Sequence, residues 1–172
     1  MLKYIKGDLI KDSSKFEVVG HQCNCFWSFG AGIAPQIKKA FPEAYQVDLK
    51  TPYGDKKKLG TIAFTEKTNP IVVNLYGQFK YTRTEVDTDY DALSNCLKEV
   101  KKNFSGKKIA FPLIGAGLAA GNWEVISSII QKELEGEDVT IIVWEKDLLN
   151  LKKFNLLWVI KEVINLTIIV WC

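Results

Sequence analysis

The chain is poor in the residues that build metal sites. It has one histidine, His21, and four cysteines among 172 residues. Structural zinc sites need four ligands, and cysteine ligands come in pairs separated by two or more residues. Cys23 and Cys25 are separated by one residue only. We therefore expect no metal, and we expect free thiols in the cytoplasm, since the cysteines are scattered and no signal peptide is evident.

Long apolar runs and a strong net charge are also missing. No uninterrupted apolar stretch approaches the roughly 18 to 20 residues that span a bilayer, and the apolar C-terminal region is broken by Lys161, Glu162 and Asn165. The net charge of +3 is too small to indicate bulk nucleic-acid binding. These features predict one globular domain with no membrane partner and a mild preference for phosphorylated ligands.

Two glycine-rich segments, 28–34 (SFGAGIA) and 111–121 (FPLIGAGLAAG), are the most informative feature that is present. Each follows an apolar run typical of a strand and precedes a helix-like segment. Exposed backbone N–H groups at such a turn bind anions. Two turns of this kind predict a site for two phosphates, and hence a ligand with a nucleotide diphosphate.

Strand-like and helix-like segments alternate along the chain. The pattern predicts strands at 2–5, 16–21, 59–64, 71–76, 108–112 and 139–144, and helices at 34–41, 89–103 and 122–134. This order is typical of an α/β fold with a largely parallel or mixed sheet and helices on both faces. A nicotinamide-cofactor fold is the alternative, but the first strand is followed by KGDLI, which lacks Gly-x-Gly-x-x-Gly.

The C-terminus repeats a short strand-like sequence. The segment 139–144 (VTIIVW) recurs almost unchanged as 166–171 (LTIIVW). We interpret 1–147 as the main domain and 148–172 as a duplicated helix-strand extension. The extension adds an edge strand to the same sheet, pairs with a second copy to form a homodimer, or has no functional role.

Four ordered motifs carry a resemblance to a known family. Gly7-Asp8-Leu9, HQCN at 21–24, GAGIA at 30–34 and PLIGAGL at 112–118 resemble the macro domain family, which binds and processes ADP-ribose. The match runs from about Leu2 to Trp144. It is most similar to the yeast-type ADP-ribose 1″-phosphate phosphatases and their bacterial and phage relatives. The resemblance implies a three-layer α/β/α fold.

The same resemblance implies which residues bind the ligand. Asp8 would read adenine, although it can also serve as a turn residue, and Trp144 would stack on the base, although a tryptophan in an apolar run is often core. The glycine turns would hold the phosphates unless the glycines serve the backbone alone. The full ligand set is Asp8, Leu9, Gly30, Gly32, Ile33, Ala34, Pro112, Ile114, Gly115, Ala116, Gly117, Leu118 and Trp144.

Three residues are candidates for catalysis. His21 stands where the phosphatase-like relatives also have a histidine, and it can transfer a proton or attack phosphorus. A buried structural histidine is the alternative. Asn24 matches the asparagine that faces the distal ribose, or it bonds a turn. Asp89 can supply an acid or base, or cap the helix that follows.

One branch of the family differs from this chain. Enzymes that remove glutamate-linked ADP-ribose use a lysine and an aspartate where this chain has Gln78 and Ala119. Neither side chain can form a Schiff base or relay a proton. The sequence thus predicts removal of phosphate from ADP-ribose 1″-phosphate without a cofactor. The alternatives are hydrolysis of ADP-ribose from protein or nucleic acid, which is the only nucleic-acid role expected, and a non-catalytic ADP-ribose reader.

Overall fold

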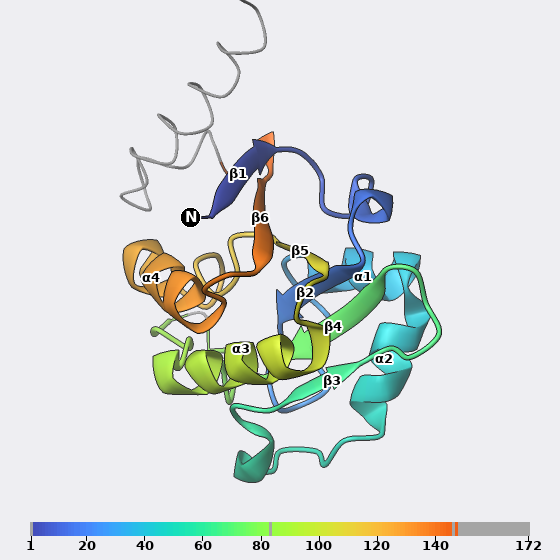
Figure 1. The fold of residues 1–172 in the computed structure, drawn as a ribbon. Helices are drawn as coiled ribbons and strands as arrows, with labels where there is room; N and C mark the ends of the chain where they lie inside the picture. Colours follow the sequence, from blue (N-terminus) through green and yellow to red (C-terminus); the bar gives the residue numbers. More distant parts are fainter. Residues whose placement is uncertain (1, 83, 146, 148–172) are drawn as a thin grey trace, which may run out of the picture.

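The protein forms a six-stranded mixed sheet between two layers of helices (Figure 1). The computed structural model describes residues 2–82, 84–145 and 147. The strands are β1 (Lys3–Lys6), β2 (Val18–Gln22), β3 (Ile62–Phe64), β4 (Ile71–Leu75), β5 (Lys108–Phe111) and β6 (Asp138–Val143). The helices are α1 (Ala34–Ala40), α2 (Pro42–Leu49), α3 (Tyr90–Phe104) and α4 (Trp123–Glu133), with 3-10 turns η1 (Ser13–Lys15) and η2 (Lys56–Lys58).

The sheet has the order β1-β6-β5-β2-β4-β3, and within the described chain only β3 is antiparallel to its neighbour. The predicted α/β fold with a mixed sheet is therefore confirmed. Because parallel strands end at the same edge, the segments that follow β1, β2, β5 and β6 meet there. Both glycine turns follow such strands.

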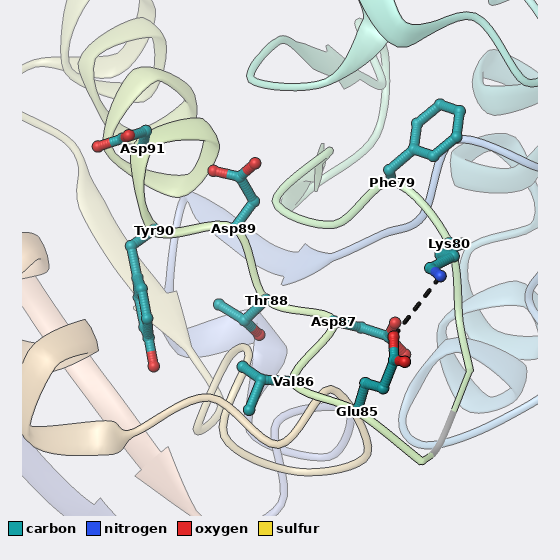
Figure 2. A pocket seen from close by; sticks show the side chains of 9 residues that line it. All are labelled: Phe79, Lys80, Glu85, Val86, Asp87, Thr88, Asp89, Tyr90 and Asp91. Atoms are coloured by element: carbon teal, nitrogen blue, oxygen red, sulfur yellow. Dashed lines mark ion pairs between the residues drawn. The ribbon is translucent and has the colours of Figure 1, made fainter.

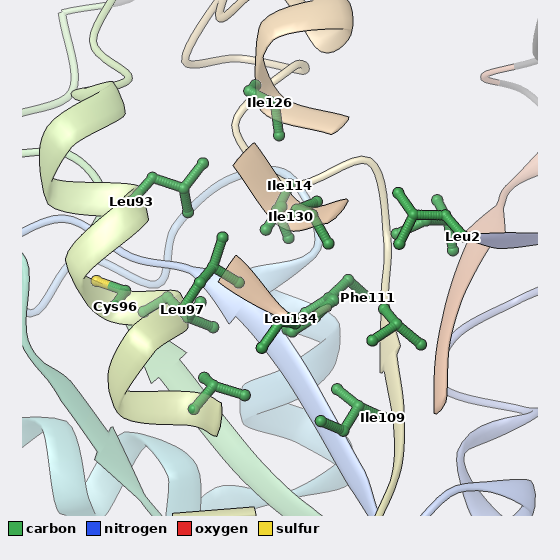
Figure 3. Packing of buried hydrophobic residues seen from close by; sticks show 14 of the residues in the cluster. Leu2, Leu93, Cys96, Leu97, Ile109, Phe111, Ile114, Ile126, Ile130 and Leu134 are labelled. Carbon is green, nitrogen blue, oxygen red and sulfur yellow. The ribbon is translucent and has the colours of Figure 1, made fainter. Parts of the chain in front are cut away.

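Each face of the sheet has its own apolar core. The larger core packs α3 and α4 against the sheet and includes Leu93 and Leu97, labelled in Figure 3, together with Val100. The smaller core lies under α1 and α2 and includes Ile37 and Ala44. The sheet is thus buried on both sides, as a parallel sheet requires.

The sequence pattern missed one helix, α2. Pro42 disfavours a helical backbone at the preceding residue, Phe41. With a φ of −134° and a ψ of 72°, Phe41 ends α1 and separates it from α2. Pro42 then occupies the first turn of α2. Only Ala44 and Asp48 are buried in α2, so its apolar periodicity is too weak to be recognised.

Two helices begin with side-chain caps. Asp89 accepts a hydrogen bond from the backbone N–H of Ala92 at 2.9 Å at the start of α3. Asn122 accepts one from the N–H of Glu124 at 2.8 Å at the start of α4. These caps satisfy N–H groups that have no partner inside the helix.

The C-terminal predictions concern residues that the structure does not describe. The duplicated helix-strand extension, 148–172, lies outside the described residues, and its proposed edge strand or dimer stays a prediction. None of the described helices has the length and apolar character needed to cross a membrane.

Candidate functional site

A cleft of 860 Å³ lies at the carboxyl ends of the parallel strands. All of the residues predicted to bind the ligand line it: Asp8, Leu9, Gly30, Gly32, Ile33, Ala34, Pro112, Ile114, Gly115, Ala116, Gly117, Leu118 and Trp144. Asn24 lines it too. The structure therefore brings both glycine turns and both ends of the described chain to one site.

The second glycine turn, 111–121, is tightly held. Gly115 has a φ of +70°, and its carbonyl accepts hydrogen bonds from the N–H of Gly121 and the hydroxyl of Thr88, both at 2.8 Å. A Cβ at Gly115 would lie 2.8 Å from the Oε1 atom of Gln22. Glycine is required here by both backbone angle and space.

The first glycine turn, 28–34, is anchored by the Phe29 ring and, at Ser28, by hydrogen bonds with the Asn24 amide. Phe29 is buried, and its ring meets those of His21 and Tyr45 with centroids 5.2 Å away in each case. A Cβ at Gly30 would meet only the Ser28 Oγ atom, at 4.0 Å. A Cβ at Gly32 would lie 3.7 Å from the Leu118 Cδ1 atom, so the two turns face each other across the cleft.

Asp8 and Trp144 lie together where β1 and β6 end. The N–H of Gly7 donates to the carbonyl of Val143 at 3.0 Å, which joins the two strand ends. Asp8 does form the turn, because its Oδ1 atom accepts from the N–H of Ile10 at 2.9 Å. It also lines the cleft. Trp144 is 41% exposed and is therefore not a core residue.

Asn24 has a fixed orientation at the cleft wall. Its Oδ1 atom accepts from the N–H of Phe26 at 2.9 Å, and its Nδ2 atom donates to the carbonyl of Ser28 at 3.0 Å. Asn24 is 7% exposed. The amide thus bonds the turn while the residue lines the cleft, so the two interpretations of this residue are compatible.

His21 does not line the cleft. Its side chain is fully buried on the face of β2 that packs against α1 and α2, because strand residues alternate between faces. The Nδ2 atom of Asn74 donates to the Ala44 carbonyl, so the Asn74 Oδ1 atom is the acceptor, and His21 Nε2–H donates to it at 2.8 Å. Burial lowers the pKa of His21 to about 4, so the ring is neutral at pH 7. The geometry does not support its expected direct action on a ligand.

Asp89 is also outside the cleft. It caps α3 and lines a second, more open hollow of 540 Å³, whose wall also carries Glu85, Asp87 and Asp91 (Figure 2). The three catalytic candidates are therefore not brought together. Of them, only Asn24 lines the cleft.

The ligand set predicted from the sequence omits several polar cleft residues, among them Gln22, Gln78, Tyr81 and Asp87. Gln22 Nε2 donates to Gln78 Oε1 and to Thr88 Oγ1, both at 3.1 Å. Asp87 lines both the cleft and the second hollow. Its N–H donates to the Ala119 carbonyl at 2.9 Å. Tyr81 and Asp87 lie in the segment 77–89, which has no helix or strand periodicity that would relate their positions to side-chain direction.

Comparison with known proteins identifies relatives over most of the chain. An uncharacterised 17.5 kDa protein of Enterobacteria phage T4 is 36% identical, covering 84% of this chain and 97% of the phage protein. An ADP-ribose 1″-phosphate phosphatase of Debaryomyces hansenii is 30% identical, covering 77% of this chain and 93% of the phosphatase. A human ADP-ribose glycohydrolase is 28% identical, covering 83% of this chain and 90% of the human protein.

Solved structures share the fold. A Bacteroides thetaiotaomicron protein of unknown function is 31% identical with a TM-score of 0.68, covering 83% of this chain and 98% of that protein. The macrodomain of Thermus aquaticus DarG is 22% identical with a TM-score of 0.64, covering 84% of this chain and 98% of that macrodomain. The family match extends over residues 21–130. With this match and these relatives, the chain belongs to the macro domain family.

Proposed function

We propose that this protein binds ADP-ribose derivatives in the cleft and hydrolyses ADP-ribose 1″-phosphate to ADP-ribose and inorganic phosphate. The observation that carries the proposal is the meeting of both glycine turns, Asp8 and Asn24 in one cleft of 860 Å³. This volume suits a dinucleotide-sized ligand. The phosphatase of Debaryomyces hansenii, similar over 77% of this chain, supports the reaction.

The ligand is held along the cleft by backbone and side chains. N–H groups of the turns 28–34 and 111–121 bind the diphosphate from both sides. At one end, the Asp8 carboxylate accepts a hydrogen bond from the adenine amine and Trp144 stacks on the base. At the other end, the amide of Asn24 orients the distal ribose.

Asp87 is the carboxylate best suited to the chemistry. Three aspartates line the cleft in the described chain: Asp8, Asp87 and Asp147. Asp8 belongs to the opposite end, and the N–H of Asp147 donates to the Trp144 carbonyl at 2.9 Å, which keeps it at that end too. Asp87 lies on the same loop segment as Gln78 and Tyr81 instead, and its carboxylate accepts hydrogen bonds from the N–H and the hydroxyl of Thr82. In the proposed step, Asp87 accepts a proton from water as the water oxygen attacks phosphorus. The bond between phosphorus and the C1″ oxygen breaks, and that oxygen takes the proton from Asp87 to give the ribose hydroxyl, while the water oxygen leaves as part of inorganic phosphate.

His21 acts in this proposal as a positioning residue. It bonds Asn74 on β4 and packs against Phe29, so it connects the sheet to the first glycine turn. Cys23 lines the cleft above it, and burial raises the pKa of the Cys23 thiol, which keeps the sulfur protonated and weakly nucleophilic. Neither residue needs to touch the phosphate.

Glycohydrolysis is the second candidate, supported by the human relative's name. A lysine-dependent route conflicts with the residues present, because Gln78 lines the cleft where the other branch has lysine. The Gln78 amide is engaged at both ends, since Oε1 accepts from Gln22 and Nε2 donates to the Lys80 carbonyl at 2.8 Å. This arrangement counts against a lysine-dependent route at this position.

The test combines ADP-ribose titration by calorimetry with phosphate release from ADP-ribose 1″-phosphate. We expect micromolar binding, about −8 kcal/mol, with phosphate release. Asp87→Asn should reduce kcat at least about 100-fold while binding persists. Asp91→Asn, the same charge change on the exposed start of α3, should leave kcat unchanged. Binding without phosphate release would indicate a reader or a hydrolase of other linkages, and absence of binding would overturn the site itself.

A further inference from the structure

Gln78 is a polar cleft residue with no part in the proposed ligand contacts. It lies beside Asn24, and both residues line the cleft. Cys25, the residue after Asn24, donates from its N–H to the Phe79 carbonyl at 3.0 Å and from its thiol to the Gln78 carbonyl at 3.7 Å. On its other side, Gln78 forms an isolated antiparallel bridge with Thr88. Gln78 therefore lies at the distal end of the cleft, where the proposed function places the reacting phosphate.

The side chain of Gln78 is held by Gln22, the last residue of β2. Gln22 Nε2 donates to Gln78 Oε1 and to Thr88 Oγ1, both at 3.1 Å. The Thr88 hydroxyl donates in turn to the Gly115 carbonyl at 2.8 Å. These hydrogen bonds join the Gln78 amide to the second glycine turn, so the position of the amide is fixed relative to the phosphate site.

Gln22 leaves one of its own polar atoms without a partner. Its Oε1 atom is buried and accepts no hydrogen bond from the described residues. A Cβ at Gly77 or at Gly115 would lie 2.8 Å from this atom, so the oxygen is enclosed by two backbone segments. A buried acceptor without a donor destabilises a fold, and an apolar side chain would fill the same space without that loss. What glutamine alone provides here is the pair of hydrogen bonds donated to Gln78 and Thr88.

The Gln78 amide keeps one acceptor and one donor position for the cleft. Its Oε1 atom accepts from Gln22 and has a second lone pair. Its Nε2 atom donates to the Lys80 carbonyl at 2.8 Å and has a second N–H. Neither position is taken by another group in the described part of the chain. A fixed amide with both positions open can accept a hydrogen bond from water while it donates one to a phosphoryl oxygen.

We propose that Gln78 is a catalytic residue of the phosphatase reaction, which orients the attacking water and binds a phosphoryl oxygen, and that Gln22 is its positioning residue. This assignment rests on the proposed function. The amide transfers no proton: one proton of the water goes to Asp87, and the other stays on the oxygen and is donated as a hydrogen bond to Gln78 Oε1. The Gln78 N–H stabilises the charge on the phosphoryl oxygen as the bond to the ribose oxygen breaks. Orientation of water and stabilisation of charge are the main contributions that proteins make to phosphoryl transfer.

The experiment measures kcat and KM for phosphate release from ADP-ribose 1″-phosphate, with ADP-ribose titrated by calorimetry. Gln78→Ala should lower kcat about 100-fold and leave KM nearly unchanged, because the contact strengthens only in the transition state. Gln78→Glu keeps the length and the acceptor but loses the donor, so its kcat should be no higher than that of Gln78→Ala. The matched control is Gln131→Ala, which removes an exposed amide from α4 and should change neither constant.

Gln22→Met tests the positioning role, because methionine fills a similar volume without donating hydrogen bonds. It should lower kcat about tenfold in the otherwise native protein. In the Gln78→Ala background it should lower kcat no further, because Gln22 acts on the reaction through Gln78. A loss of ADP-ribose affinity, which reflects the support of the second turn through Thr88, should be the same in both backgrounds. Additive losses of kcat would overturn the positioning role.

The outcomes separate this assignment from the proposed function. If the wild type releases phosphate and Gln78→Ala or Gln78→Glu keeps its kcat, the assignment fails and the proposed function stands. If Gln78→Ala loses ADP-ribose binding together with kcat, Gln78 has a structural role and the assignment also fails. If the wild type binds ADP-ribose and releases no phosphate, the proposed reaction fails and the assignment fails with it.

Discussion

The two glycine turns look alike in the sequence and differ in how they are held. The second turn is fixed by several hydrogen bonds, including those to the Gly115 carbonyl from Gly121 and Thr88. The first turn depends on Phe29, which packs against His21 and Tyr45, and on the Asn24 amide, which bonds only its first residue, Ser28. A glycine motif therefore indicates a turn but says nothing about its rigidity. We expect the second turn to be a fixed wall of the cleft and the first to be the part that adjusts.

The largest effect should come from Gly115→Ala. The new Cβ would be 2.8 Å from Gln22 Oε1, and φ is +70°. Left-handed strain and overpacking together should lower the free energy of unfolding by roughly 4 kcal/mol. Urea denaturation measures this. Gly117→Ala is the control, because a Cβ there meets nothing within 4 Å. Equal stability of the two variants would contradict a rigid second turn.

The second-largest effect should come from acid, which protonates His21, the residue that packs against Phe29 of the first turn. The pKa of His21 is about 4 in the folded protein and 6.5 in the ordinary reference state, so the unfolded chain takes up the proton first. The contribution of neutral His21 to the free energy of unfolding is therefore complete above about pH 6.5, and roughly 3 kcal/mol of it is lost as the pH drops to 4. Denaturation at several pH values should show this loss in the wild type. The carboxylates titrate in both proteins, so the difference in pH dependence between the wild type and His21→Gln measures the effect of His21 alone. Equal pH dependence in the two proteins would contradict this prediction.

A smaller effect is expected at Thr88. Its hydroxyl donates to the Gly115 carbonyl and accepts from Gln22, so Thr88→Val removes a buried pair of hydrogen bonds and should cost about 2 kcal/mol. ADP-ribose affinity should fall about tenfold, because the second turn loses its lateral support. Calorimetry and thermal unfolding check both values. Thr88→Ser keeps the hydroxyl and should behave as wild type.

Gly30→Ala should have the smallest effect on stability. Its Cβ would meet only the Ser28 Oγ atom at 4.0 Å, so the free energy of unfolding should change by less than about 0.5 kcal/mol. Affinity for ADP-ribose should fall a few-fold because the methyl group enters the cleft. A stability loss comparable to that of Gly115→Ala would remove the distinction between the turns.

The sequence predicts those parts of the molecule in which backbone geometry decides. The alternating elements and the convergence of both turns follow from periodicity and glycine placement, and the Asp89 cap follows from a side chain that can accept a hydrogen bond at a helix start. The missed helix α2 has almost no buried side chains to produce a pattern. Asp87 and Gln78 lie in an irregular segment, where no repeat relates position to direction. For His21, the family resemblance indicated a role, while strand alternation alone would have turned its side chain toward α1 and α2.

The pairing of β1 with β6 sets the order in which the site can assemble during synthesis. Lys3 pairs with Thr140, so β1 can pair with β6 only after almost the whole described chain has been synthesised. Contacts between such distant positions close late because of the loop entropy that they require. On the ribosome, both glycine turns emerge before β6 does, and Asp8 meets Trp144 only afterwards. A truncated product that ends before β6 would carry both turns and still lack one end of the cleft.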